Sequence, residues 1–270
     1  MPLQVINGIG IAGIRGSSSN QSNQVSLDTD AQAFITAASI IDTTQKNAVN
    51  DLVLALKASG LWAKMNALYP MVGGTSTSHS INLKTPGTYN LVFNGGWSHS
   101  ITGAYSNGSN AYATTGVYLP SLNSTHISFY ARMQLIGNFV MGSKRGPAWS
   151  TSAGTYLRPR GPSQAEYTVN TNAGPHAVNN SNSQGLFIAT RTTSTSSALF
   201  IRGVKNSNSS TSTSAPITDI LLGAAYTQTS VNYGQQECAF ASIGVGLTDV
   251  DVSNFHNAVQ AFQTTLGRQV

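Results

Sequence analysis

Residues 70–247 alternate between short apolar segments and clusters of turn-forming residues. The apolar segments include residues 89–93, 111–115, 126–134, 185–191, 198–204, 217–226 and 237–245. Gly, Pro, Asn and Ser cluster between them, as in Asn94-Gly95-Gly96. Short strands separated by turn signals at this density are typical of a two-sheet antiparallel sandwich or jelly roll. The tract 205–214 is too polar to pack, so we expect a protruding loop or hairpin tip there.

Helical periodicity precedes this β-rich body. Asp28 or Asp30 can cap a first short helix over residues 31–39. Asp42 then begins a capping box as the N-cap, with Gln45 reaching back to its backbone. Apolar residues follow at helical spacing and form one stripe, namely Ala48, Val49, Leu52, Val53 and Leu56. Because such a stripe is normally buried, this helix must pack on its neighbours, on a second copy of the chain or on the β-rich body.

Stop signals mark the end of this helical segment. Gly60 suits the C-cap of the second helix. Residues 61–69 then predict a further helix, which Pro70 stops.

A closing helix is predicted at the end of the chain. Thr248 is its cap, Asp249 and Asp251 lie in its first turn where the helix dipole favours acids, and Gly267 ends it. Three apolar residues share one face of this helix and should lie on the sandwich: Phe255, Val259 and Phe262.

The first 25 residues combine apolar side chains with glycines. The apolar residues are Val5, Ile6, Ile9, Ile11 and Ile14. Such a segment has strand-forming side chains but too little mass for a core, so we expect it to anchor the protein against a partner. A floppy terminus is the alternative. The sequence therefore predicts an extended anchoring arm over 1–25, a helical linker or oligomerisation segment over 26–69, and a sandwich domain over 70–270.

The chain is sparsely charged. Only 9% of its 270 residues are Asp, Glu, Lys or Arg, and the net charge is +5. The basic residues are scattered, whereas a nucleic-acid-binding protein normally carries a basic stripe with interleaved aromatics. We therefore expect no nucleic acid as a partner. The chain has no apolar run of about 18 residues and no signal peptide, so we expect no membrane insertion.

Carboxylates are few in the last three quarters of the chain. They are Glu166, Asp219, Glu237, Asp249 and Asp251, and no two of them stand at the spacing of a working pair. General acid–base and metal-binding chemistry in hydrolases depends on such groups. The sequence thus predicts that the protein is not an enzyme and has no metal site and no cofactor. The single cysteine, Cys238, lies in an apolar run and is expected to be a buried structural thiol.

Several motifs follow one another in a familiar order. They are Leu61-Trp62-Ala63-Lys64-Met65-Asn66-Ala67-Leu68-Tyr69-Pro70, Phe93-Asn94-Gly95-Gly96-Trp97, Gly108-Ser109-Asn110-Ala111-Tyr112-Ala113, Leu122-Asn123-Ser124-Thr125-His126-Ile127-Ser128 and the closing stretch 240–249. Over roughly residues 60–270, their order and spacing resemble concanavalin A-like (laminin-G-like) domains of tailed bacteriophage virion proteins.

The resemblance implies a mostly β, two-sheet antiparallel jelly roll in a virion that is assembled in the bacterial host cytoplasm. It leaves the capsid and the tail open as locations. The glycine-rich arm resembles amino-terminal segments that fasten phage fibres and decoration proteins, which implies other virion proteins as partners. The apolar stripes of the helical segment add the expectation of a homo-oligomer.

Sugar recognition needs aromatic platforms beside hydrogen-bonding side chains. The candidate glycan-binding residues are Trp97, Trp149, Tyr156, Arg158 and Arg160, all in turn-rich segments. A core position is the alternative for Trp97, and a place against a loop is the alternative for Trp149. The sequence favours a virion structural protein of the fibre or capsid-decoration type that displays a lectin-like domain to host-surface glycans. A lectin module outside a virion is the alternative, and a glycan-cleaving enzyme is the least favoured.

Overall fold

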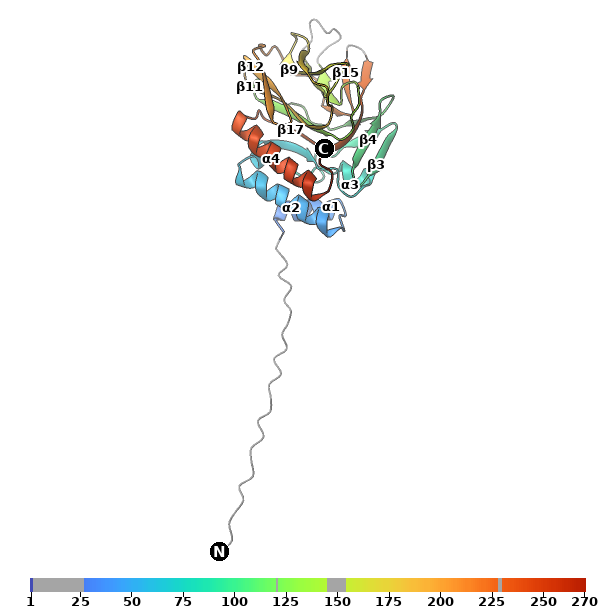
Figure 1. The fold of residues 1–270 in the computed structure, drawn as a ribbon, viewed down its shortest axis with the longest axis vertical. Coiled ribbons are helices and arrows are strands. Elements are labelled where there is room, and N and C mark those ends of the chain that lie inside the picture. Colours follow the sequence, from blue (N-terminus) through green and yellow to red (C-terminus); the bar gives the residue numbers. More distant parts are fainter. Residues whose placement is uncertain (2–26, 120, 145–153, 228–229) are drawn as a thin grey trace.

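Two antiparallel sheets face each other, and a layer of helices covers the outer side of one of them (Figure 1). The computed structural model describes residue 1 and residues 27–119, 121–144, 154–227 and 230–270. The predicted anchoring arm, with Val5, Ile6, Ile9, Ile11 and Ile14, and the candidate residue Trp149 lie outside the described residues. The prediction of a mostly β, two-sheet antiparallel sandwich with a closing helix is confirmed.

Sheet A is the larger of the two sheets. In spatial order it contains β13 (Val204–Asn208), β12 (Ser196–Ile201), β11 (Gly185–Thr193), β6 (Thr125–Ala131), β17 (Gln235–Gly244), β4 (Gly103–Asn107) and β3 (Trp97–Ser100), with β1 (Met65–Tyr69) also paired to β17. Every pairing in this sheet is antiparallel.

Sheet B forms the second layer. In spatial order it contains β10 (His176–Asn179), β9 (Gln164–Thr171), β8 (Gly154–Arg158), β7 (Met141–Lys144), β14 (Leu221–Leu222), β5 (Tyr112–Thr114) and β2 (Val92–Asn94). A separate hairpin of β15 (Ala224–Thr227) and β16 (Ser230–Tyr233) follows β14 and lies close to β7.

The helices begin and end largely where the sequence predicts. They are α1 (Thr29–Ala37), α2 (Thr43–Ala58), the 3-10 turn η1 (Trp62–Lys64), α3 (Ser76–Ser80) and α4 (Asp249–Thr265). Asp42 accepts a hydrogen bond from the backbone N–H of Gln45 at 2.8 Å, as a cap does. The side chain of Gln45 differs from the prediction, because it accepts from the N–H of Gly73 at 2.8 Å instead of reaching back to Asp42. Gln45 therefore ties α2 to the segment after β1.

The predicted helix over residues 61–69 is wrong. The chain makes the short turn η1 and then continues as strand β1, which pairs with β17. Alternate residues of β1 pack on opposite sides: Ala67 and Tyr69 face sheet B, whereas Met65 and Leu68 face the helices. A strand that is buried on both faces reads as a continuous apolar run, which resembles a short buried helix in sequence.

The prediction of a loop or hairpin tip over 205–214 needs a similar correction. Residues 204–208 form the edge strand β13, which pairs with β12. Polar residues are tolerated there because an edge strand leaves one side of its backbone and much of its side-chain surface in water.

Sheet A is buried on both faces. On β11, Phe187 and Ala189 belong to the hydrophobic cluster between the two sheets, and Leu186 and Ile188 belong to the cluster beneath the helices. The cluster beneath the helices also contains the apolar stripes of α2 and α4, including the predicted face of Phe255, Val259 and Phe262. The helices of the amino-terminal segment and the closing helix therefore pack side by side on the same sheet (Figure 1). The thiol of Cys238 is fully buried, and burial raises its pKa.

Candidate functional site

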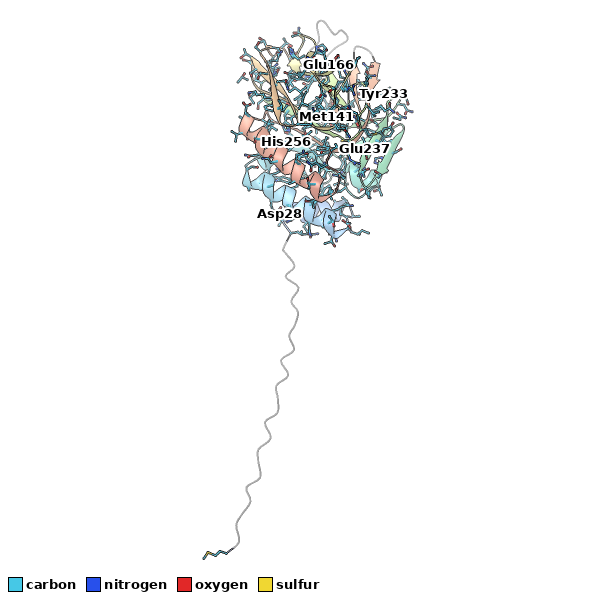
Figure 2. All side chains as sticks on the ribbon, in the orientation of Figure 1. Asp28, Met141, Glu166, Tyr233, Glu237 and His256 are labelled. Carbon is cyan, nitrogen blue, oxygen red and sulfur yellow. The ribbon has the colours of Figure 1, made fainter. Side chains whose placement is uncertain are left out.

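An open pocket lies at one end of the sandwich, where connections from both sheets meet. Its volume is about 370 Å³, and its lining residues are Asn107, Gly108, Ile136, Gly137, Asn138, Arg158, Pro162, Tyr233 and Gln235. Four connections supply them: the turn after β4, the loop between β6 and β7, the turn after β8 and the junction of β16 with β17. The two labelled residues of this end, Glu166 and Tyr233, lie far from Asp28, which begins the helix layer (Figure 2).

Arg158 is the one basic residue among the described residues of the lining, and its position is fixed from two sides. The register of β8 and β9 places it opposite Glu166, with which it forms an ion pair. Its guanidinium carbon lies 5.5 Å from the centre of the Phe139 ring, within cation–π range. The buried Nε atom has no hydrogen-bond partner among the described residues. Arg158 is thus a cation held in place at the wall of the pocket.

Aromatic rings stand behind and beside this arginine. Tyr156 packs edge-on against Phe139 with ring centres 4.4 Å apart. Tyr156 is 2% exposed, and burial raises the pKa of its hydroxyl, so the hydroxyl stays protonated. Tyr233 lines the pocket directly and lies 6.3 Å from the ring of Tyr112 on β5.

Amide side chains complete the lining, and they differ in how many hydrogen bonds they already make within the protein. Asn107 accepts from the N–H groups of Ser109 and Asn110 at 3.0 and 3.1 Å, so it holds its own turn together. Gln235 donates to the hydroxyl of Tyr105 at 2.6 Å. The exposed side chain of Asn138 makes no hydrogen bond to any residue that the structure describes, so both ends of its amide can meet a ligand.

The residues predicted from sequence are only partly brought together. Arg158 lines the pocket and Tyr156 supports it from behind. Arg160 lines a small neighbouring hollow with Leu135 and Ser183. Trp97 lies on β3, where its ring packs edge-on against Phe93 at 5.1 Å and covers Gly223. Of the four described candidates, Arg158 is the one that lines the pocket.

Of the lining residues, only Arg158 was a candidate from the sequence, and the polar and aromatic residues that it did not predict include Asn138, Tyr233 and Gln235. The only local signal was a polar or aromatic residue next to a glycine, as in Gly137-Asn138 and Tyr233-Gly234-Gln235. That signal is common in turns of every kind. These residues become a set only because the strand order brings their loops together.

A pair of histidines lies outside the pocket. The Nδ1 atoms of His79 and His99 are 3.0 Å apart, so one ring donates to the other. Burial lowers the pKa of His79 to about 3, which keeps this ring neutral. Among the residues that the structure describes, no three His, Cys, Asp or Glu side chains gather as metal ligands would. Every helix within the described ranges is too short or too polar to span a bilayer.

No protein-family model matches the chain, and no curated protein matches it by sequence. Solved structures do match. The chain is similar to Trypanosoma rangeli sialidase in complex with sialic acid, with a TM-score of 0.55 and 8% identity over 77% of this chain and 38% of that one. It is also similar to a mutant of that sialidase with trans-sialidase activity, with a TM-score of 0.51 and 9% identity over 78% of this chain and 39% of that one.

A third match is a mutant of a protein called HCR/D, with a TM-score of 0.51 and 8% identity over 73% of this chain and 52% of that one. The chain thus spans about two fifths of the sialidases and about half of HCR/D. At these identities the likeness shows the fold, a β-sandwich of the jelly-roll kind.

These matches correct one prediction from the sequence. The scarcity of carboxylates in a β-rich body was taken to mean that the protein is not an enzyme, and this prediction is wrong. Structures with the same fold include sialidases, one of them with trans-sialidase activity. The sandwich therefore occurs within glycan-processing enzymes.

Proposed function

We propose that this protein is a glycan-binding module whose ligand enters the pocket around Arg158, Asn138 and Tyr233. The observation that carries the proposal is the lining itself, in which a held guanidinium, an unpartnered amide and an aromatic ring converge. Sugars present hydroxyl groups in the plane of the ring and apolar C–H groups on its faces, and this combination of side chains binds both. The sialidase neighbour in complex with sialic acid supports a carbohydrate as the ligand class.

We propose further that the module is displayed on a bacteriophage virion, as a fibre or decoration protein that attaches to host-surface glycans. The arrangement of the fold supports this proposal. Residue 27 leads into the helix layer, and Asp28 lies at the end of the molecule opposite Glu166 and Tyr233 (Figure 2). An anchor attached through residues 1–25 would leave the pocket facing outward. Other virion proteins would be the partners of the arm, and other copies of the chain would be its neighbours.

Glycan binding can be tested with the full chain on an array of sialylated glycans and bacterial surface polysaccharides. We expect the protein to bind at least one glycan, and Asn138→Ala to bind it about fivefold more weakly, because an amide hydrogen bond contributes about 1 kcal/mol. Asn257→Ala is the matched control, since Asn257 is exposed on α4 in the helix layer. No retained glycan, or equal losses in both variants, would refute the proposal. Release of free sugar, measured in parallel, would show turnover in addition to binding.

Virion attachment has its own test. Deletion of residues 1–25 should give a folded protein that no longer joins phage particles, and Ile9→Asp with Ile11→Asp should have the same effect, because a dry groove rejects charge. Ile41→Asp with Ile101→Asp is the matched control, since these side chains are 88% and 71% exposed. Normal occupancy of particles by the truncated protein would place the anchor elsewhere.

A further inference from the structure

Four tyrosines lie on or beside strand β5 of sheet B and the hairpin of β15 and β16, and one of them lines the pocket. Tyr233 lines the pocket, Tyr112 lies on β5, Tyr226 lies on β15 and Tyr118 follows β5. We call these four residues the tyrosine track. The pocket and the track share Tyr233, so the two form one continuous surface.

Contacts and electrostatics show that the members of the track are neighbours. The rings of Tyr112 and Tyr233 are 6.3 Å apart and inclined at 45°. Tyr226 pairs with Val231 across the β15–β16 hairpin, so it shares a face of the hairpin with Tyr233, which lies two residues further along β16. Burial is the main cause that raises the pKa of Tyr226, and the electrostatic interaction with Asp219 adds to it. Tyr118 ends the track and is 62% exposed.

A fixed carboxylate accompanies the rings. Asp219 Oδ2 accepts from the N–H groups of Thr115 and Gly116 at 3.1 and 3.0 Å. The N–H of Ile220 donates to the carbonyl of Val117 at 3.0 Å, which keeps Asp219 beside the start of the Tyr118 segment. Within the described residues both hydrogen bonds to this carboxylate use Oδ2, so Oδ1 can accept from a ligand hydroxyl.

The track has a composition that suits sugar rings. Its phenol rings offer flat apolar faces, and each hydroxyl can donate and accept. An acceptor carboxylate lies beside them, and apolar Val92 and Ile217 are exposed at 60% and 63% next to the same strands. Large exposed apolar side chains on one face normally mark a binding surface. Because the track begins at the pocket, which is the proposed glycan site, we take a glycan and not a protein as the ligand that covers the track.

We propose that the ligand is a linear oligosaccharide of several sugar units, which places one end in the pocket and stacks the following units on the tyrosine track. This inference rests on the proposed glycan-binding function and specifies its ligand as a chain and not a single sugar. The pocket gives hydrogen-bonded recognition of one unit, and the track adds affinity with each further unit that reaches it.

The test uses size-fractionated oligosaccharides of one, two, four and six units, cut from each polysaccharide that the glycan array retains. Calorimetry with the full chain should show affinity that rises with length. Tyr118→Ala should weaken the affinity for the six-unit ligand about fivefold and leave the affinity for the single sugar unchanged, since one stacked ring contributes about 1 kcal/mol. Tyr118→Phe should retain most of the affinity, because it keeps the ring face.

The remaining outcomes distinguish a failure of the tyrosine track from a failure of the proposed glycan-binding function on which it rests. Equal affinity for all lengths, with Asn138→Ala still weakening binding, would overturn the track and leave the pocket in place. If the unchanged protein binds no oligosaccharide of any length, both the track and the glycan-binding pocket are overturned. Unchanged sugar affinity in Tyr118→Ala together with a changed oligomeric state in light scattering would overturn the inference and identify a protein interface.

Discussion

Arg268 donates through Nε to Oε1 of Gln263 over 2.9 Å, and both side chains are fully buried. The remaining guanidinium N–H groups donate to the backbone carbonyls of Pro70, Met71 and Ala239 at 2.7–3.2 Å. Burial lowers the pKa of Arg268 to about 9, yet the group remains charged at neutral pH. The end of the chain is therefore tied both to the segment after β1 and to the central strand β17.

Removal of this guanidinium should be among the most damaging single changes in the fold. Arg268→Met keeps most of the side-chain volume but removes the donors to Oε1 of Gln263 and to the carbonyls of Pro70 and Met71, whereas the carbonyl of Ala239 keeps the hydrogen bond from Nε2 of Gln263. We expect a loss of about 3–5 kcal/mol in the free energy of unfolding, measured by urea denaturation. Lys205→Met, which breaks the exposed ion pair with Asp249, should cost no more than about 1 kcal/mol. Similar small losses in both variants would contradict this account.

Acid should destabilise the protein through its buried histidines. His126 contacts the carbonyl oxygen of Val245 at 2.6 Å, and burial lowers the pKa of His126 to about 4. An unfolded histidine has a pKa of about 6.5. Between these values the unfolded chain binds more protons than the folded one, so the stability falls as the pH falls, by at most about 1.4 kcal/mol per pH unit for this group.

His126→Asn provides the measurement. Urea unfolding at pH 7, 5.5 and 4.5 should give a shallower loss of stability in the variant than in the parent protein, although the variant starts from a lower value. The pKa of His79 is also lowered, to about 3, and its contribution should persist in the variant. Parallel pH profiles for the two proteins would show that His126 is already charged in the folded state.

Gly244 marks a close approach between β17 and the turn before β1. A Cβ at this position would overlap the carbonyl oxygen of Lys64, which accepts from the N–H of Val245 at 3.0 Å. Gly244→Ala should therefore lower the free energy of unfolding by at least about 2 kcal/mol. Gly87→Ala is the contrasting variant, since Gly87 has a φ of +91° but open space around it, and it should cost about 1 kcal/mol. An equal loss of unfolding free energy in Gly244→Ala and Gly87→Ala would mean that β1 can move away from β17 at little cost.

A substitution of Trp97 can show whether this side chain serves the packing of the fold or contacts the ligand. Its ring packs against Phe93 and Gly223, and its Nε1 is buried without a partner among the described residues. We expect Trp97→Ala to lower the free energy of unfolding by about 3 kcal/mol and to leave glycan affinity unchanged below the melting transition. An affinity loss at intact stability would instead make Trp97 part of the binding surface.

Local signals were read correctly from the sequence where they act within a few residues. The caps at Asp42 and Thr248 form as predicted, and Thr248 makes a complete capping box with Asp251. Gly60 and Gly267 adopt the positive φ values that helix ends require. Each of these features depends on neighbours along the chain, so a single sequence contains the necessary information.

Features that depend on distant segments could not be read in the same way. Residues 65–69 became a strand because β17 lies beside them, and Gln45 turned to Gly73 because β1 delivers that glycine to the end of α2. The pocket has the same origin. Arg158 was a candidate for its charge, whereas Asn138 and Tyr233 acquire meaning only from loops more than sixty residues apart that the strand order brings together.

The burial of sheet A on both sides has a consequence for how such a chain can diverge. A substitution on β6, β11 or β17 alters the packing against sheet B or against the helices, so these strands have little freedom to accept new side chains. Sheet B has no helix layer on its outer face, and the connections at one end of both sheets carry the pocket. Mutational drift and deliberate redesign of specificity should therefore concentrate in the turns after β4 and β8 and in the hairpin of β15 and β16, while the middle layer stays nearly constant.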